Sequence, residues 1–365
     1  MRIKEILKIT NGKLISGDPD RDIDLASISS DSRTIERGAF FLPIRGENFD
    51  GEKFVSEALK KGAIGTFVVR DSSFVIRRTS HETRTTNDEK IIIQVKDTTK
   101  ALQQIAHAHR MKFDIPVIGI TGSNGKTTTK DMIYEVLSSK FNVLKNEGTK
   151  NNHLGVPQTL LKLNKKHKMC VLEMGMNHKG EIRLLAGIAR PDIAVITNIG
   201  PSHLKFLKDL EGVFEAKKEI TAFLKKDGLL IANGDDEYLS GLKGRRFRIE
   251  RFGFDGKNDL RASLVAADLD RIEFLLNDKD VYGLNILGTH NVYNALAAIA
   301  VARHFKLGAG PIRKGLAGYK PGHMRLNIKK IAGITVIDDA YNSNPLSMQC
   351  ALQAMRYIQQ PQNGS

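Results

Sequence analysis

Short runs of apolar residues alternate with segments of helical periodicity through the middle of the chain. The runs are PVIGIT, MCVLEMGM, DIAVITNI and DGLLIAN, all within residues 116–233. Continuous apolar runs of this length are typical of strands buried on both faces, and their alternation with helices is typical of βαβ units. The pattern therefore predicts an α/β domain with a parallel sheet covered by helices on both faces.

A smaller α/β domain is predicted before this region. It contains the short apolar runs AFFLPIRG and GAIGTFVVR, the helical segment FVSEALKKGA, the strand IIIQVKD and the helix TKALQQIAHAHRMKF. The polar run RRTSHETRTTNDEK, residues 77–90, lacks apolar periodicity and predicts a loop. The domain boundary is expected near Asp114 and Pro116, so that the first domain covers residues 1–113.

The central domain is expected to cover residues 114–318 and to include the apolar run VYGLNILG and the Ala-rich helix NVYNALAAIAVARHF. A new strand and turn, GITVIDDAYNSNP, begins at residue 333 and precedes the helical segment SMQCALQAMRYI. The polar QQPQNGS then ends the chain. Residues 319–365 are therefore expected to be the start of a third domain.

Composition agrees with several domains. A chain of 365 residues with 41% hydrophobic content can bury more than one core, at roughly 100–200 residues per domain. The net charge of +15 is compatible with a nucleic-acid partner, a Lys-rich surface or a polyanionic small substrate. No nucleic-acid partner is expected, because the basic residues are mixed with acidic ones and no aromatic residues are interleaved with them.

The two cysteines, Cys170 and Cys350, form no C-x-x-C pair, which supports neither a disulfide framework nor a thiolate metal site. The N-terminus has no apolar signal-peptide region, and no stretch approaches the roughly 20 apolar residues that span a bilayer. A cytoplasmic protein is expected.

The segment GITGSNGKTTTKD, residues 119–131, follows an apolar run and begins a helical one. Counted back from Gly125, the usual phosphate-loop pattern requires glycine at position 120, where the chain has Ile120. The loop is therefore shorter than the usual one, but a strand before it and a helix after it form the geometry that attracts phosphate. Lys126 is expected to face solvent and the phosphates, and Thr127 to reach Mg²⁺.

Three further residues are candidates for the same edge of the sheet. Glu173 and His203 lie near the ends of two apolar runs, where α/β proteins bind ligands. A cation would offset the cost of burying Glu173, although a carboxylate more commonly caps a turn. A lone histidine such as His203 is more commonly a structural residue than a ligand. Composition alone makes Lys217, in EGVFEAKKEITAFL, a solvated helix lysine paired with neighbouring acids.

Seven ordered segments resemble the Mur ligases of bacterial cell-wall synthesis, and the resemblance covers essentially the whole chain. They are TGSNGKTTT, EGTKNNHLGVP, LEMGMNHKGEI, NIGPSHL, EAKKEI, GTHNVYNALAA and DDAYNSNP. GTKNN, EMGMN and DDAYNSNP most resemble the members that join D-alanyl-D-alanine to UDP-N-acetylmuramoyl-tripeptide. SSDSR and GAFFLPIRGENFDGEKF are similar to the UDP-substrate domain of those members.

The resemblance implies an ATP-dependent amide-bond ligase that works through an acyl phosphate, with UDP-N-acetylmuramoyl-tripeptide and D-alanyl-D-alanine as its partners. It also implies a fold: a small α/β UDP-substrate domain, a parallel-sheet ATPase domain and an incomplete Rossmann-like domain. ATP and Mg²⁺ are the implied cofactors, and a monomer is expected.

The resemblance also implies roles for individual residues. The ATP phosphates would be bound by Gly122, Ser123, Asn124, Gly125, Lys126, Thr127 and Thr128, and the magnesium ions by Thr127, Glu173, His203 and Lys217. Lys217 matches the lysine that the family carbamylates, and Lys126, His203 and Lys217 would be catalytic. Adenine, phosphate and ribose would contact Asn291, Arg325 and Asp339, respectively. The UDP moiety would face Ser30, Asp31, Ser32 and Arg33, and the muramoyl end would approach Asn151 and Asn152.

Three alternatives stay open. One is a Mur ligase that adds a single amino acid, and a more remote one is folylpolyglutamate synthase, which shares the loop but not GTKNN. The third is a truncated, non-catalytic protein that binds the nucleotide and the UDP substrate.

The chain departs from the family pattern at Lys205, where many members have an acid after the His-Leu pair.

Overall fold

The computed structural model describes residues 1–46, 49–69, 90–244, 246–267, 271–322 and 324–359. Most of the predicted polar loop at 77–90 and the tail from residue 360 lie outside these ranges. The chain forms two compact units, Met1–Asp114 with His153–Lys165, and Ile115–Asn152 with Lys166–Ser365. The chain therefore leaves the second unit after Asn152, contributes one segment to the first, and returns.

The first unit contains a five-stranded sheet in the order β1-β5-β4-β3-β2. Its strands pair in parallel except β1 with β5. The elements are α1 (Ile3–Thr10), β1 (Lys13–Ser16), η1 (Leu25–Ser27), β2 (Ile28–Ser29), β3 (Phe40–Phe41), η2 (Gly51–Phe54), α2 (Val55–Lys60), β4 (Gly65–Val69), β5 (Ile91–Val95), α4 (Thr98–Arg110) and α6 (Gly155–Leu160). The predicted helices in FVSEALKKGA and TKALQQIAHAHRMKF are confirmed as α2 and α4.

Local chemistry explains where α4 begins and what it packs against. The Asp97 side chain accepts a hydrogen bond from the Lys100 amide at 2.9 Å, which caps the first turn of the helix. Leu102 and Ile105 are buried on one face of the helix. His109 contacts the Leu163 carbonyl at 2.9 Å, so the returning segment packs on α4 within the same unit.

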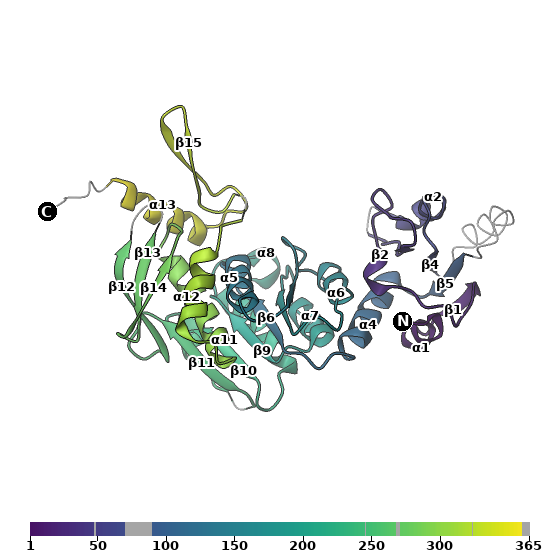
Figure 1. The fold of residues 1–365 in the computed structure, drawn as a ribbon, viewed down its shortest axis with the longest axis horizontal. Helices are drawn as coiled ribbons and strands as arrows, with labels where there is room; N and C mark the ends of the chain where they lie inside the picture. Colours follow the sequence, from purple (N-terminus) through teal and green to yellow (C-terminus); the bar gives the residue numbers. More distant parts are fainter. Residues whose placement is uncertain (47–48, 70–89, 245, 268–270, 323, 360–365) are drawn as a thin grey trace. The chain divides into compact units, whose positions relative to one another are not determined.

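The second unit is built on a nine-stranded sheet in the order β14-β13-β12-β11-β10-β9-β6-β8-β7 (Figure 1). Its strands are β6 (Val117–Thr121), β7 (Val143–Lys145), β8 (Met169–Glu173), β9 (Ile193–Ile196), β10 (Leu229–Asn233), β11 (Arg248–Gly253), β12 (Leu260–Ala267), β13 (Ile272–Leu276) and β14 (Asp280–Leu284). The four apolar runs of the sequence are confirmed as β6, β8, β9 and β10, which pair in parallel.

The sheet is not parallel throughout. β12 pairs antiparallel with β13, and β13 with β14, so three strands extend the parallel part as a meander. Of the strands in this sheet, β7, β11, β12 and β13 were not predicted from the sequence. Buried and partly exposed residues alternate along β13, a pattern that differs from the continuous apolar runs of the central strands.

Helices cover both faces of this sheet. They are α5 (Lys126–Ser138), α7 (Glu181–Ala189), α8 (Leu204–Leu207), α9 (Leu210–Lys218), η4 (Glu219–Phe223), α10 (Glu237–Ser240), α11 (His290–His304) and α12 (Ala309–Gly318). Along β6, Ile118 and Ile120 belong to the core beneath α5 and α11, whereas Gly119 faces Ile220 of η4. This alternation places the two helical layers on opposite faces.

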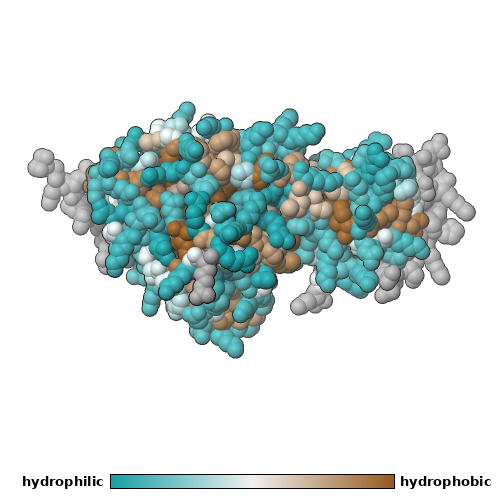
Figure 2. Space-filling model, turned by 90° about the horizontal axis from the view of Figure 1, so that it is seen from below, coloured by the Kyte–Doolittle hydropathy of each residue, from teal (hydrophilic) through white to brown (hydrophobic). Residues whose placement is uncertain are grey.

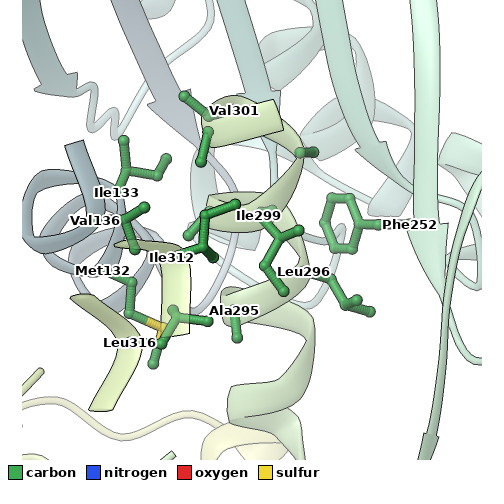
Figure 3. Packing of buried hydrophobic residues seen from close by; sticks show 14 of the residues in the cluster. Met132, Ile133, Val136, Phe252, Ala295, Leu296, Ile299, Val301, Ile312 and Leu316 are labelled. Atoms are coloured by element: carbon green, nitrogen blue, oxygen red, sulfur yellow. The ribbon is translucent and has the colours of Figure 1, made fainter. Parts of the chain in front are cut away.

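The main core lies between the sheet and the helices α5, α11 and α12. Figure 3 shows how side chains from these three helices and Phe252 of β11 pack together. The labelled residues are Met132, Ile133 and Val136 of α5, Ala295, Leu296, Ile299 and Val301 of α11, and Ile312 and Leu316 of α12. Because α11 is buried around most of its circumference, it fixes the position of α5, whose first turn follows the glycine loop.

The C-terminal part begins with a hairpin of β15 (Asn327–Ile331) and β16 (Ile334–Asp338), followed by α13 (Pro345–Gln359) (Figure 1). The strand and the helix predicted after residue 333 are confirmed as β16 and α13, but β15 was not predicted. Ile331 and Ile334 are more than half exposed, so this hairpin has little core of its own.

The surface is mainly hydrophilic on the face drawn in Figure 2, with hydrophobic residues interspersed among the hydrophilic ones. Within the described ranges, none of the helices combines the length and the apolar character needed to cross a lipid bilayer.

Candidate functional site

The glycine loop connects β6 directly to α5, as the sequence predicts. Its backbone is held by residues 197–200, which follow β9. The Ser123 hydroxyl donates to the Gly200 carbonyl at 2.8 Å, and the Asn124 amide donates to Oδ1 of Asn198 at 2.9 Å. The Thr197 hydroxyl donates to the Asn124 carbonyl at 2.5 Å. The neighbouring strand end therefore sets the shape of the loop.

Both loop glycines occupy positions that exclude a side chain. Gly122 has φ of +153°, and a Cβ there would overlap the Thr197 hydroxyl. Gly125 has φ of +78° and precedes the first residue of α5. A Cβ on Gly125 would lie 2.5 Å from Oδ1 of Asn294. The spacing of the short loop thus follows from two close approaches of its backbone to other elements.

Substituting Gly125→Ala is expected to weaken ADP binding by at least about tenfold and to lower the melting temperature. The left-handed backbone costs alanine roughly 1–2 kcal/mol, and the contact with Asn294 displaces the loop further. Calorimetric titration with ADP and thermal unfolding measure the two effects.

Gly180→Ala is the matched control for this substitution. Gly180 has φ of +90° and also precedes a helix, but a Cβ there would meet no atom within 4 Å. This variant should lose stability through its backbone alone and bind ADP normally. Equal losses of ADP affinity in both variants would contradict the steric explanation.

The Lys126 side chain is half-buried and curls back over the loop. Its Nζ donates to the carbonyls of Gly122 at 2.9 Å and Ser123 at 3.0 Å. Desolvation lowers the pKa of Lys126, and the negative charge of Glu173 partly offsets this. The prediction that Lys126 faces solvent is therefore wrong, because two carbonyls of the loop hold its ammonium group.

The two threonines after Lys126 lie in the first turn of α5 and are partly exposed. Oγ1 of Thr127 accepts a hydrogen bond from Nη2 of Arg325 at 3.2 Å. The Thr128 side chain hydrogen-bonds Tyr319, whose pKa burial raises to about 12. The first turn of the helix is thus tied to the chain that follows α12.

Glu173 ends β8 on the face that α5 covers, because it continues the alternation of Met169 and Val171 in the core beneath that helix. Its Oε1 accepts a hydrogen bond from Nδ2 of Asn151 at 2.7 Å. Its Oε2 is buried and has no hydrogen-bond partner among the described residues, and the Lys130 ammonium lies 4.0 Å away. A buried carboxylate oxygen without a partner is costly, and a divalent cation would satisfy it.

His203 follows β9 and precedes α8 with φ of +53°, a strained conformation for a residue with a side chain. Partial burial lowers the pKa of His203, and the charges of Lys217 and Lys126 lower it further. The imidazole is therefore neutral near pH 7, which is the form that binds metals.

Lys217 lies on the inner face of α9 with a side chain only 2% exposed. Its Nζ donates to the Gly122 carbonyl at 2.9 Å, and no carboxylate of the described residues forms an ion pair with it. Burial holds the pKa of Lys217 well below its usual value, and the charge of Lys126 adds to this effect. The prediction from composition, that Lys217 is solvated and paired with an acid, is wrong. The neighbouring Lys218 is the partly exposed lysine that pairs with Glu215.

The structure thus gathers Lys126, Lys217, Glu173 and His203 around the Gly122 end of the loop. The two lysines donate to the same carbonyl oxygen, and the positive charge of each lowers the pKa of His203. Over the described ranges, no cluster of three or more His, Cys, Asp or Glu side chains is arranged to hold a metal. Glu173 and His203 alone would be an incomplete ligand set.

Asn291 lies in the first turn of the buried helix α11, and its amide is engaged within the protein. Its Nδ2 donates to the Leu287 carbonyl at 2.7 Å, and its Oδ1 accepts from Nδ2 of Asn294 at 2.9 Å. Oδ1 of Asn294 in turn accepts from the Thr129 hydroxyl of α5 at 3.0 Å. The observed role of this pair is to join α11 to α5, and the adenine contact of Asn291 stays a prediction.

Of the C-terminal residues predicted to hold phosphate and ribose, Arg325 contacts the first turn of α5 and Asp339 contacts the chain next to Arg325. The Arg325 guanidinium contacts Thr127 and stacks over the Tyr341 ring, 4.2 Å from its centroid. Oδ1 of Asp339 accepts from the Leu326 amide at 3.1 Å, and burial raises the pKa of Asp339. The structure brings Arg325 to the loop, whereas the ribose role of Asp339 stays a prediction.

The residues predicted to face UDP belong to the first unit. Asp31 accepts three hydrogen bonds from Arg33, which hold the pKa of Asp31 at about 2. Ser30 Oγ accepts from Nε2 of Gln158 at 3.0 Å, and the buried Ser32 accepts from Nζ of Lys61 at its carbonyl. The Arg33 side chain is 84% exposed, and Asp31 engages its Nε and Nη2.

Asn151 and Asn152 differ in their surroundings. Asn152 is exposed, whereas Asn151 is half-buried and contacts Glu173. Their predicted approach to the muramoyl end stays a prediction.

Sequence reasoning missed several polar residues that shape the site: Thr197, Asn198, Asn294 and Asn344. Asn344 exchanges two amide hydrogen bonds with Asn124, at 2.7 and 3.3 Å. Thr197 and Asn198 directly follow β9, so their position at a strand end was a usable signal. Asn294 and Asn344 gave no such signal, because their partners are distant in sequence.

Two family models match the chain. The Mur ligase middle domain matches residues 120–302, and the Mur ligase family, catalytic domain, matches residues 24–110. Together with the fold and the glycine loop, these matches define the class: the chain belongs to the Mur ligase family. Its α/β fold, with a small first domain and a central, mainly parallel sheet, is confirmed.

Within that family, one curated relative is UDP-N-acetylmuramoyl-tripeptide–D-alanyl-D-alanine ligase of Bacillus subtilis. It is 40% identical over 353 residues, which cover 96% of this chain and 74% of the relative. The namesake from Escherichia coli is 32% identical over 97% of this chain and 76% of the relative. The C-terminal truncation expected from the family resemblance is not borne out by these matches, which cover 96% and 97% of this chain.

Solved structures give the same likeness. MurF from Acinetobacter baumannii superposes with a TM-score of 0.86 at 32% identity, over 98% of this chain and 76% of that chain. MurF ligase from Thermotoga maritima, in complex with ADP, has a TM-score of 0.78 at 28% identity, over 92% of this chain and 76% of that chain.

Proposed function

We propose that the chain is an ATP-dependent ligase that joins D-alanyl-D-alanine to UDP-N-acetylmuramoyl-tripeptide in peptidoglycan precursor synthesis. The observation that carries this proposal is the buried Lys217, whose ammonium shares the Gly122 carbonyl of the glycine loop with Lys126. The names of the curated relatives supply the substrates, and the ADP complex of the Thermotoga maritima protein supports a nucleotide at the loop.

The chemistry follows from the weakness of a carboxylate as an acyl donor. A carboxylate oxygen of the tripeptide attacks the γ-phosphorus of ATP, the bond to the bridging oxygen breaks, and ADP leaves. The amine of D-alanyl-D-alanine then attacks the acyl carbon, loses a proton, and expels phosphate from the tetrahedral intermediate to form the amide. The protein's contribution is to position the reactants and to stabilise the charge that develops.

We assign the phosphates to residues 122–128, with Lys126 on the γ-phosphate and Arg325 beside it. We assign adenine to Asn291 and ribose to Asp339. The UDP moiety would contact residues 30–33, and the muramoyl end would approach Asn151 and Asn152. The exposed Arg33 and the contact of Arg325 with Thr127 support these assignments.

Mg²⁺ is proposed as the second cofactor, held by Thr127, Glu173, His203 and a carbamylated Lys217. When bound, Mg²⁺ neutralises phosphate charge. The open Oε2 of Glu173 and the lowered pKa of His203 fit a cation at this position. The lowered pKa of Lys217 fits carbamylation, because only the neutral amine attacks CO₂, forming the N–C bond and releasing one proton.

We further propose the division into a UDP-substrate domain at 1–113, an ATPase domain at 114–318 and a C-terminal domain at 319–365. A cytoplasmic monomer belongs to the same proposal. ATP and UDP-linked substrates, which are cytoplasmic metabolites, support the location.

The test is ADP release measured with each substrate omitted in turn. Release should require both UDP-N-acetylmuramoyl-tripeptide and D-alanyl-D-alanine. Replacing D-alanyl-D-alanine by lysine, diaminopimelate or glutamate tests a ligase that adds a single amino acid, and this reaction should be slow. Binding of the UDP substrate without turnover would instead identify a non-catalytic binding protein.

A further inference from the structure

Glu173 is surrounded by polar groups of residues 146–151. The proposed mechanism does not use their contacts with Glu173. Residues 146–151 fold over the end of β8, and the fully buried side chain of Asn146 holds them there. Its Oδ1 accepts from the Glu173 amide at 2.9 Å, and its Nδ2 donates to the Glu173 carbonyl and to the Lys150 carbonyl, both at 3.0 Å. The backbone of Glu173 is thereby fixed to this segment.

The side chain of Glu173 is fixed by the same segment. Nδ2 of Asn151 donates to Oε1 at 2.7 Å, and the Asn151 carbonyl accepts from the Gly175 amide at 2.8 Å. A Cβ on Gly175 would lie 2.6 Å from Oδ1 of Asn151, so the Asn151 amide group is packed against the backbone after β8. Asn151 therefore has little freedom to turn away from Glu173.

The two carboxylate oxygens of Glu173 consequently differ. Oε1 is engaged by Asn151, whereas Oε2 has no hydrogen-bond partner in the described ranges. The Lys130 ammonium is 4.0 Å from Oε2, too far for a hydrogen bond, and donates instead to the Gly148 carbonyl at 3.2 Å. Lys130 lies between the carboxylates of Asp131, at 3.6 Å, and Glu173, and it anchors the segment while leaving Oε2 open.

We propose that Asn151 is a positioning residue that holds Oε1 of Glu173, so that Oε2 is presented to the divalent cation. This inference rests on the proposed function, because it requires Glu173 to be a metal ligand. Without the Asn151 amide, the carboxylate would rotate toward Lys130 and pair with it. Partners of this kind, which orient a metal ligand without touching the metal, typically change metal affinity about 10- to 100-fold.

The test measures Mn²⁺ affinity by electron paramagnetic resonance with saturating ADP and no UDP-linked substrate. Under these conditions the proposed contact of Asn151 with the muramoyl end contributes nothing. Asn151→Ala should weaken Mn²⁺ binding about 10- to 100-fold. Lys150→Ala is the matched control, since this exposed neighbour pairs only loosely with Glu147 at 3.9 Å, and it should bind Mn²⁺ normally. A change of less than about twofold in Asn151→Ala would overturn the inference.

A double-mutant cycle with Glu173→Ala separates positioning from a general loss of structure. Once Glu173 is absent, adding Asn151→Ala should change Mn²⁺ affinity by less than about twofold, because both residues act through one carboxylate. Additive losses would overturn the inference. If Glu173→Ala leaves Mn²⁺ affinity unchanged, the proposed metal role of Glu173 fails as well. If only Glu173→Ala weakens it, the inference fails and the metal role stands.

Discussion

Lys217→Ala is expected to reduce ADP release by at least about 10³-fold while leaving the protein folded. The substitution removes the buried amine that is proposed to carry the additional carboxylate ligand. Folding should survive because a buried, unpaired lysine costs stability, and its removal leaves an apolar methyl group in its place. Coupled measurement of ADP release and thermal unfolding test the two expectations.

Lys218→Ala is the matched control, because Lys218 is the next residue of α9 but is partly exposed and paired with Glu215. It should retain full activity. A short-chain acid such as formate or acetate should restore part of the activity of Lys217→Ala by supplying the missing carboxylate. Bicarbonate alone should not, since no amine remains to be carbamylated. Full activity of Lys217→Ala without any added acid would rule out the carbamate.

Lys126→Ala is expected to abolish nucleotide-dependent turnover, with a loss of about 10³-fold or more in the rate of ADP release. The ammonium is anchored by two loop carbonyls, so it is positioned to neutralise charge on the transferred phosphoryl group. Thermal unfolding should change little, because these hydrogen bonds lie at the edge of the site rather than in the core.

Lys140→Ala, an exposed position just beyond the C-terminal end of the same helix, controls for the general loss of one positive charge and should behave as the parent protein. Ligation by Lys126→Ala at a rate within tenfold of the parent would show that the glycine loop has been misassigned.

The fold was predictable where the signal was local. Each continuous apolar run of the central domain became a central strand. The glycine loop after the first of these strands leads directly into a helix, as its sequence indicates. β12 and β13 were missed because an antiparallel extension with one partly exposed face does not produce such runs.

The site was predictable in part for the same reason. Glu173 and His203 were found because strand ends are visible in the sequence. The burial of Lys217 was not, because two consecutive lysines in a helix leave open which of them faces inward. That choice depends on the distant Gly122 carbonyl, and only the family resemblance singled out Lys217. Asn294 and Asn344 escaped for a similar reason, since their partners lie more than 160 positions away in the chain.

The return of His153–Lys165 to the first unit has a practical consequence for dissecting the molecule. The chain passes between the units at three places, after Asp114, Asn152 and Lys165. A fragment that starts at residue 115 would therefore carry α6 without the α4 surface on which it packs. Swapping substrate units between relatives would require three coordinated breakpoints. Two of them flank the segment that begins at His153, two residues after Asn151, so a hybrid gene has to preserve the junction beside Glu173 as well.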